Sequence, residues 1–197
     1  SWYIVQDENG KAFNARIKGK FKIDSITSTN PVAVGDIVLA DMENELENTV
    51  TITDIAPRKN YITRSSPHNR HQHHIIASNL DQSLLFATLK EPKTSLGFID
   101  RFLITSEAYH VPSILVFNKS DLYKEKELSR FNEVKEIYEA IGYKVLLISI
   151  EKNIGIEEVK SLLKDKTTLL SGHSGVGKSS FINIVFPDLR LKTQDVS

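Results

Sequence analysis

The second half of the chain alternates short apolar runs with longer amphipathic stretches. The apolar runs cover 83–89, 114–118, 145–149 and 168–171, and the amphipathic stretches after them cover 99–109, 125–141, 156–163 and 178–186. Short apolar runs indicate buried strands, and amphipathic stretches of eight or more residues indicate helices. Strand and helix alternate four times, which predicts an α/β fold with a parallel sheet and flanking helices.

The stretch 125–141 carries the helical pattern most clearly. Its apolar residues recur at spacings of three and four, which places them on one side of a helix. The predicted buried stripe consists of Leu128, Phe131, Val134, Ile137, Tyr138 and Ile141. We interpret these side chains as core and assign them no cofactor role.

The first 57 residues have a different pattern, that of short strands separated by turns. The predicted strands cover 2–6, 12–23, 36–40 and 49–55, and Glu8-Asn9-Gly10 is a turn sequence. This pattern predicts a small all-β barrel over residues 1–57.

Basic residues occupy alternate positions in the second predicted strand. Arg16, Lys18, Lys20 and Lys22 would share one face, while Ile17, Phe21 and Ile23 would point inward. The basic face is either a solvated strand surface or a nucleic-acid-binding surface.

Residues 55–80 contain no acidic residue, and we predict a basic linker over 58–74. Its cations are Arg58, Lys59, Arg64 and Arg70, and its histidines are His68, His71, His73 and His74. The histidine spacing matches no familiar metal site, so a solvated or phosphate-contacting linker is the favoured interpretation. Tyr61 would suit stacking on an RNA base.

Composition adds limits rather than a function. Twenty-five basic residues balance twenty-five acidic ones, so only the local distribution of charge is informative. The chain contains no cysteine, which excludes disulfides and thiolate zinc sites within it. Neither a signal peptide nor a long apolar segment is present, so we expect a cytoplasmic protein without a membrane partner.

A glycine-rich loop follows the apolar run 168–171. The sequence GHSGVGKSS at 172–180 has the strand, loop and helix context of a phosphate loop, whose backbone N–H groups surround a β-phosphate. Lys178 is the predicted catalytic cation, and the Ser179 hydroxyl is the predicted Mg²⁺ ligand. The predicted phosphate-binding residues are Gly172, His173, Ser174, Gly175, Val176, Gly177, Lys178, Ser179 and Ser180, among which His173 is expected to be a solvent-facing filler.

A second motif, Asn118-Lys119-Ser120-Asp121, follows the apolar run 114–118 at the carboxyl end of a predicted strand. The Asp121 carboxylate can accept hydrogen bonds from guanine N1–H and the exocyclic amine, a pair of donors that adenine lacks. The Lys119 stem can lie over the purine, and Asn118 can tether a neighbouring loop. Ser149 opens a third candidate loop, whose base contact would rest on backbone groups.

The order of the two motifs is the reverse of that in ordinary GTPases, where the phosphate loop comes first. The inversion predicts a circularly permuted P-loop GTPase domain over residues 75–197. If the same strands keep the same order in space, rejoining the chain elsewhere preserves the site.

These features together resemble the RsgA/YjeQ family of ribosome small-subunit-dependent GTPases along the whole chain. The resemblance also rests on Ser1-Trp-Tyr-Ile-Val5, on Arg58-Lys-Asn-Tyr61 with Arg64, on Ile76-Ala-Ser-Asn79 with Asp81-Gln82, and on Ile99-Asp-Arg-Phe-Leu103. It implies an N-terminal OB-like barrel and GTP or GDP with Mg²⁺ as cofactors. It also implies a monomer whose hydrolysis is stimulated by the 30S subunit, with 16S rRNA as partner and a role in late small-subunit maturation.

Two family features are missing from the sequence. No Asp-x-x-Gly segment follows Ser179, and Thr193 is a poor candidate for a switch threonine. We expect a GTPase domain that is incomplete at its C-terminal end, with switch residues beyond Ser197 and Zn²⁺ only in a downstream domain. Such a chain should bind GDP and hydrolyse GTP poorly.

Two other functions remain open at this point. One is a nucleotide-gated RNA-binding module in which turnover is incidental. The other is an ATP-dependent kinase or ATPase, which Asn118 and Asp121 disfavour.

Overall fold

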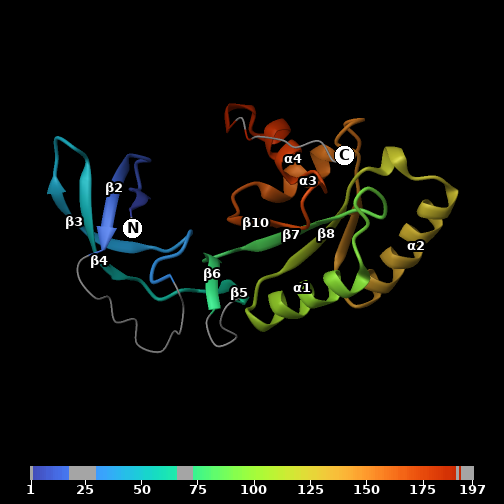
Figure 1. Cartoon of the computed structure of the whole chain (residues 1–197), viewed down its shortest axis with the longest axis horizontal. Helices are drawn as coiled ribbons and strands as arrows, with labels where there is room; N and C mark the ends of the chain where they lie inside the picture. Colours follow the sequence, from blue (N-terminus) through green and yellow to red (C-terminus); the bar gives the residue numbers. More distant parts are fainter. Residues whose placement is uncertain (1, 18–29, 66–72, 190, 192–197) are drawn as a thin grey trace. The chain divides into compact units, whose positions relative to one another are not determined.

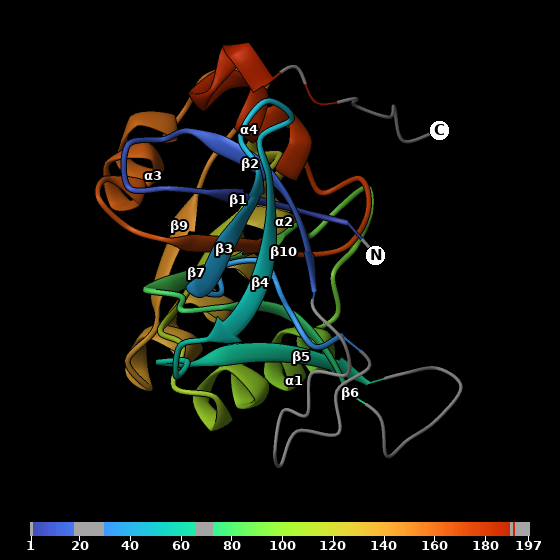
Figure 2. The same cartoon turned by 90° about the vertical axis from the view of Figure 1, so that its left-hand side faces the viewer.

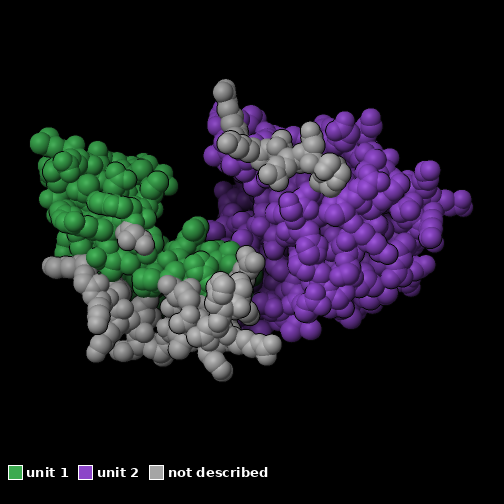
Figure 3. Space-filling model, in the orientation of Figure 1, with its two compact units in different colours: residues 1–79 green, residues 80–197 purple. Residues whose placement is uncertain are grey.

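The structure, a computed structural model, describes residues 2–17, 30–65, 73–189 and 191. The chain divides into two compact units, unit 1 with Ser1–Asn79 and unit 2 with Leu80–Ser197 (Figures 1 and 3). In the part of the chain that is described, no helix combines the length and the apolar character that crossing a membrane requires.

Unit 1 contains a four-stranded sheet made of β1 (Tyr3–Gln6), β2 (Ala12–Ile17), β3 (Val38–Asn44) and β4 (Thr49–Ile55) (Figure 2). The strand order is β1-β2-β4-β3, with β2 and β4 parallel and the other two pairs antiparallel. Apolar residues alternate with polar ones along β4, so Val50 and Ile52 face a core that they share with Ala15 and Val32. Every helix or strand described in unit 1 is a strand, in agreement with the sequence pattern.

The predicted cationic face of unit 1 is described only at its first residue. Arg16 is exposed on β2 and forms an ion pair with Glu43 of β3. Lys18, Lys20 and Lys22 lie outside the described residues, as do Phe21 and Ile23.

The chain forms a hairpin where the sequence predicts a linker. β5 (Tyr61–Ser65) pairs with β6 (His73–Ser78) in an antiparallel manner, and both strands belong to unit 1. Ile62, Ile75 and Ala77 are buried, so an alternating apolar pattern underlies a segment whose basic residues dominate its composition. Arg70, His68 and His71 lie outside the described residues, and the side chains of Arg64 and His73 are not described.

The structure does not support one predicted RNA contact, because the side chain of Arg58 is largely buried. Its guanidinium donates to Asp36 through Nε at 2.7 Å and through Nη2 at 2.6 Å, and the two side chains are 7% and 0% exposed. Burial would raise the pKa of Asp36, but hydrogen bonds from Arg58, Ser78 and the Ala33 N–H outweigh it and hold that pKa below its ordinary value. Arg58 therefore stabilises unit 1 and presents no charge to a partner.

Unit 2 is built on a four-stranded parallel sheet. Its strands are β7 (Gln82–Ala87), β8 (Ser113–Phe117), β9 (Lys144–Leu147) and β10 (Thr168–Ser171), in the order β10-β7-β8-β9. Every residue of β7 is buried because the strand is central and helices cover both faces. The predicted parallel α/β sheet is confirmed.

The helices of unit 2 form two layers. α1 (Leu96–Ala108) and α2 (Glu125–Ala140) pack against Leu85, Leu115 and Phe117, whereas α3 (Ile156–Leu163) and α4 (Lys178–Val185) pack against Leu84 and Phe86. In Figure 1, α3 and α4 lie above β7 and α1 lies below it. Short 3₁₀ turns at Ser120–Leu122 and Pro187–Leu189 complete the unit.

The buried stripe of α2 is narrower than its apolar pattern. Phe131, Val134 and Tyr138 are buried, and they span roughly 60° of arc at 100° per residue. Three further residues were predicted to be core, and this prediction is wrong because they flank the arc and face solvent. They are Leu128, Ile137 and Ile141, with exposed fractions of 42%, 53% and 65%.

Candidate functional site

The strand order of unit 2 reverses between β10 and β7. Two crossovers lead from β7 to β8 and then to β9 on one face, and α3 returns on the other face to place β10 beside β7. At such a reversal the connections that leave neighbouring strands run to opposite faces of the sheet and leave room for a ligand outside the carboxyl ends of the strands. The loop 172–177 leaves β10 at this point.

Two glycines let this loop approach its neighbours closely. Gly172 has φ +137°, and a Cβ there would lie 2.3 Å from the Phe86 carbonyl oxygen at the end of β7. Gly177 has φ +104°, and a Cβ there would lie 2.3 Å from Asn118 Nδ2. Any other residue would push the loop away from β7 and from the 118–121 motif.

Lys178, the first residue of α4, lies folded over this loop. Its Nζ donates to the carbonyl oxygens of Gly172 at 2.8 Å and His173 at 2.7 Å. An ammonium has three N–H donors, so these bonds leave one donor for a further acceptor. Burial lowers the pKa of Lys178, and an anion placed beside the ammonium would oppose that effect.

The side chain of Asn118 joins three loops. It is 2% exposed, donates from Nδ2 to the Val176 carbonyl at 2.9 Å, and accepts from the Ile150 N–H at 3.2 Å. The main-chain carbonyl oxygen of Asn118 accepts from the Tyr123 hydroxyl at 2.8 Å. The predicted phosphate loop, the 118–121 motif and the loop after β9 are thus held together through one residue.

Asp121 lies at the entrance of the site and is held by Ser149. The Ser149 hydroxyl donates to Asp121 Oδ1, and the Lys152 N–H donates to that hydroxyl at 3.1 Å. Ser149 is fully buried, whereas Asp121 is exposed. The third loop is therefore brought to the 118–121 motif by the Ser149 side chain as well as by the backbone of Ile150.

Lys119 adopts a left-handed conformation, with φ 66°, and its Nζ donates to the carbonyl oxygen of Glu91. Glu91 belongs to the loop after β7, so this loop also borders the site. The hydrogen bonds of Asn118, Asp121 and Ser149 bring together the 118–121 motif, the loop after β9 and the loop 172–177.

Sequence reasoning missed Tyr123, which lies two residues after the 118–121 motif. Its hydroxyl accepts from the Leu89 N–H at 2.8 Å while it donates to Asn118. Burial raises the pKa of Tyr123 to about 12. A tyrosine in an otherwise polar loop was the available signal, because a buried hydroxyl needs partners.

Two further predicted site residues are His173, in the loop 172–177, and Ser179, in α4. The His173 ring is exposed but not isolated, because it stacks on Phe98 of α1 with ring centroids 3.9 Å apart. Ser179, the second residue of α4, carries a hydroxyl suited to Mg²⁺. Among the described residues, no three His, Cys, Asp or Glu side chains gather as a metal site.

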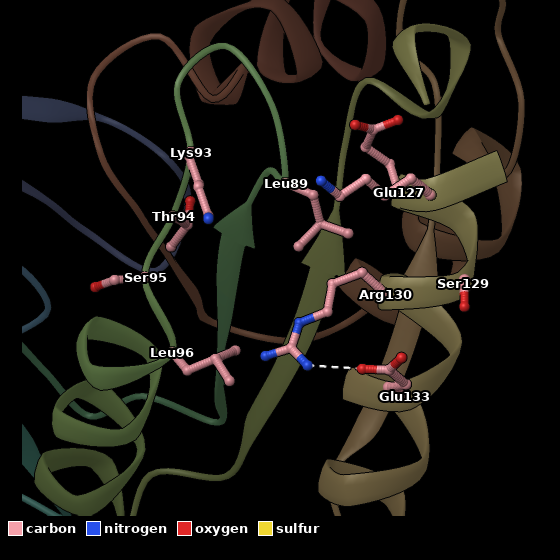
Figure 4. Close-up of a pocket in the computed structure, with 10 residues that line it drawn as sticks. Leu89, Lys93, Thr94, Ser95, Leu96, Glu127, Ser129, Arg130 and Glu133 are labelled. Atoms are coloured by element: carbon pink, nitrogen blue, oxygen red, sulfur yellow. Dashed lines mark hydrogen bonds and ion pairs between the residues drawn. The ribbon is translucent and has the colours of Figure 1, made fainter. Parts of the chain in front are cut away.

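A separate cavity of about 600 Å³ lies between the start of α1 and the first turns of α2. Leu89 and Leu96 supply apolar walls, and Arg130 extends from α2 toward Leu96 while pairing with Glu133 (Figure 4). No predicted nucleotide residue lines this cavity. It shares Leu89 with the site, because the Leu89 N–H donates to the Tyr123 hydroxyl.

A parallel α/β sheet whose phosphate loop follows the 118–121 motif in sequence and is bonded to it through Asn118 defines a circularly permuted GTPase domain. The family model "RsgA GTPase" matches residues 55–197, and "RsgA N-terminal domain" matches residues 1–50. The chain belongs to the RsgA GTPase family.

Relatives and solved structures agree with this assignment. The small ribosomal subunit biogenesis GTPase RsgA of Flavobacterium psychrophilum is 51% identical over the whole chain and 61% of its own length. The protein of that name from Cytophaga hutchinsonii is 49% identical over 93% of this chain and 60% of its own. The chain therefore spans less than two thirds of these relatives.

Two solved structures are similar in fold. YjeQ from Thermotoga maritima has a TM-score of 0.76 and 34% identity, over 98% of this chain and 64% of its own. YloQ, described as a circularly permuted GTPase, has a TM-score of 0.68 and 31% identity, over 95% of this chain and 61% of its own.

Proposed function

We propose that this protein binds GDP and GTP through the loops joined by Asn118 and hydrolyses GTP in small-ribosomal-subunit biogenesis. The observation that carries the proposal is the pair of hydrogen bonds that Asn118 makes with Val176 and Ile150, which link the predicted phosphate loop to the 118–121 motif and the loop after β9. Relatives named small ribosomal subunit biogenesis GTPase support the biological role.

Each group of the proposed site would have its own role in binding the nucleotide or Mg²⁺. The loop N–H groups of 172–177 would surround the β-phosphate, and Lys178 would use its remaining N–H on the β- and γ-phosphates. Asp121, oriented by Ser149, would accept from guanine N1–H and the exocyclic amine. Ser179 would hold Mg²⁺, which neutralises charge that develops during phosphoryl transfer.

Ribosome attachment would draw on the cations of unit 1 other than Arg58. Lys59 is exposed, and Arg16 is exposed beside Glu43. Together with Lys18, Lys20, Lys22, Arg64 and Arg70 they form the set that we propose contacts 16S rRNA of the 30S subunit. A monomer acting in the cytoplasm fits this role.

Two measurements test the proposal. Calorimetric titration of the chain should give a GDP affinity at least about 100-fold above that for ADP, since ADP lacks the two donors that the Asp121 carboxylate would accept from. GTP turnover of the protein at the length of its relatives should rise when 30S subunits are added. Equal affinity for GDP and ADP would exclude the site, and nucleotide-dependent 30S binding without stimulated turnover would favour an RNA-binding module.

A further inference from the structure

The residue on which His173 stacks is fixed in place by its helix. Phe98 lies in the first turn of α1, where its N–H donates to the Ser95 hydroxyl at 3.2 Å and caps the helix. Ile99 and Leu103 of α1 are buried in the core beneath β7 and β8. The Phe98 ring is therefore held by a helix that cannot shift without disturbing the core.

The His173 ring rests on this fixed surface. The two rings lie 3.9 Å apart between centroids with an interplanar angle of 31°, a tilted contact that is closer than the separation of about 4.5–7 Å common for aromatic pairs. The contact joins the two helix layers, because α1 lies in one layer and the phosphate loop leads into α4 in the other.

The main chain of His173 supports Lys178. The His173 carbonyl oxygen accepts from Lys178 Nζ at 2.7 Å, beside the bond to Gly172 at 2.8 Å. A side chain anchored on Phe98 restrains the peptide whose oxygen holds the ammonium. The stack thus acts on the position of Lys178 through one residue.

The loop between β7 and α1, which leads to Phe98, also contacts the 118–121 motif and Tyr123. The Leu89 N–H donates to the Tyr123 hydroxyl at 2.8 Å, and the Glu91 carbonyl accepts from Lys119. Residues 88–98 therefore connect the 118–121 motif at one end with the phosphate loop at the other.

We propose that Phe98 is a positioning residue for the phosphate loop and acts through the ring of His173. The proposal rests on the proposed nucleotide function. Phe98 touches no reacting atom; its role is to hold the loop in the geometry that receives a β-phosphate.

Substitution of Phe98 should weaken the contacts to the phosphates and leave the contacts to the base unchanged. An aromatic pair of this geometry corresponds to about a 2- to 12-fold change in an equilibrium constant. Phe98→Leu should weaken GDP binding about 3- to 10-fold. It should change GMP binding less than about 2-fold, because GMP lacks the β-phosphate that the loop surrounds.

Phe102 offers a matched control. It is a half-buried phenylalanine on the same helix and packs on the same core, but its ring makes no aromatic contact with His173 among the described residues. Phe102→Leu removes similar apolar contact and should leave the ratio of GDP to GMP affinity unchanged. Phe98→Tyr keeps the ring and should recover most of the GDP affinity.

A double-mutant cycle on the 197-residue chain isolates the contact. In the His173→Ala background, Phe98→Leu should lose at least half of its effect on GDP affinity. An undiminished effect in that background, or an equal effect of Phe102→Leu, overturns the proposal.

A nucleotide-independent measurement separates this inference from the proposed function. In NMR spectra of the nucleotide-free chain, the ring protons of His173 should be shifted by the Phe98 ring current and should return toward unshifted positions in Phe98→Leu. Unshifted protons in the parent overturn the stack even if GDP binds. A parent that binds no GDP overturns the nucleotide function and the positioning role together.

Discussion

The side-chain amide of Asn118 donates to the main-chain oxygen of Val176 at 2.9 Å, and this bond joins two loops that are 58 residues apart in the sequence. Asn118→Ala should leave the Val176 carbonyl and the Ile150 N–H without partners at a buried position. We expect the free energy of unfolding to fall by about 2 kcal/mol and GDP binding to weaken more than about 10-fold. Urea unfolding and calorimetric titration measure the two effects.

Asn183 supplies the control for this variant. Its side chain also makes two hydrogen bonds to backbone groups, both on Leu191, but at a more exposed position outside the loops. Asn183→Ala should cost less than about 1 kcal/mol and leave GDP affinity unchanged. Similar losses for both variants would contradict the linking role of Asn118.

Base selectivity should depend on the carboxylate of Asp121. Asp121→Asn replaces an acceptor with a donor toward the exocyclic amine of guanine, so GDP affinity should fall about 100-fold while xanthosine diphosphate gains. Competition titrations with both nucleotides measure the change. Asp188→Asn, at a short 3₁₀ turn after α4, should alter neither affinity. A variant at Asp121 that still prefers GDP would exclude the base contact.

Mg²⁺ dependence should separate two neighbouring residues of α4. Lys178→Ala removes the cation at the phosphates and should weaken GTP binding with or without the metal. Ser179→Ala should weaken it chiefly in the presence of Mg²⁺, since the hydroxyl serves the metal. Titrations with Mg²⁺ and with EDTA compare the two. If Ser179→Ala responds to Mg²⁺ as the parent does, Ser179 is not the ligand.

Acid should weaken unit 1 through Asp36. Its pKa is held below the ordinary value of 3.8, so the ionised pair with Arg58 stabilises the fold fully above that value, and the stabilisation is lost as the pH falls through the folded pKa. Asp36→Asn should lower the free energy of unfolding by about 3 kcal/mol at pH 7, with a smaller difference toward pH 2. Urea unfolding across this range measures it.

The exposed pair of Arg16 with Glu43 provides the comparison. Glu43→Gln should cost less than about 1 kcal/mol at pH 7, because an exposed pair is screened by water. An Asp36→Asn variant whose deficit is equally large at pH 7 and pH 2 would show that the loss comes from packing and not from the charge.

Attachment to the 30S subunit should be salt-dependent through unit 1. Lys18→Glu, Lys20→Glu and Arg64→Glu together should lower the salt slope of binding by about 2 units, since each lost phosphate contact removes about 0.7 to 0.9 counterions. GDP affinity should stay the same. The matched reversal of three exposed lysines in unit 2, Lys126, Lys160 and Lys164, should leave the slope nearly unchanged. Equal slopes for the parent and the unit 1 variant would exclude this surface.

The fold of unit 2 could be predicted from sequence because each strand is a short apolar run and each helix is amphipathic. The apolar pattern does not predict which side chains are buried where burial depends on residues distant in the sequence. Ile137 and Ile141 have the same apolar character as Val134, yet only Val134 reaches the sheet. Arg58 is basic and sits among basic residues, but its partner, Asp36, lies 22 residues away. No local pattern reveals such a pair.

The candidate site divides in a similar way. Glycine and lysine spacing predicted the phosphate loop, since its chemistry is local. Three contacts depend on the strand order, because their partners are far apart in the sequence. They are Ser149 with Asp121, Tyr123 with Leu89, and His173 with Phe98, at separations of 28, 34 and 75 residues. Ser149 was predicted with a role for backbone groups, whereas its hydroxyl makes the contact with Asp121.

The place of β10 in the sheet has a consequence for how the protein is made. β10 pairs with β7 across 86 residues, as the bond between Gln82 and Thr168 illustrates. A ribosome synthesises the chain from its N-terminus, so the guanine-side loops emerge well before the loop that surrounds the phosphates. In the usual GTPase order, the phosphate loop would emerge first. If the proposed site binds nucleotide, a nascent chain would capture it only after β10 has paired with β7 and α4 has folded, so a bound nucleotide would report that unit 2 is complete through Ser180.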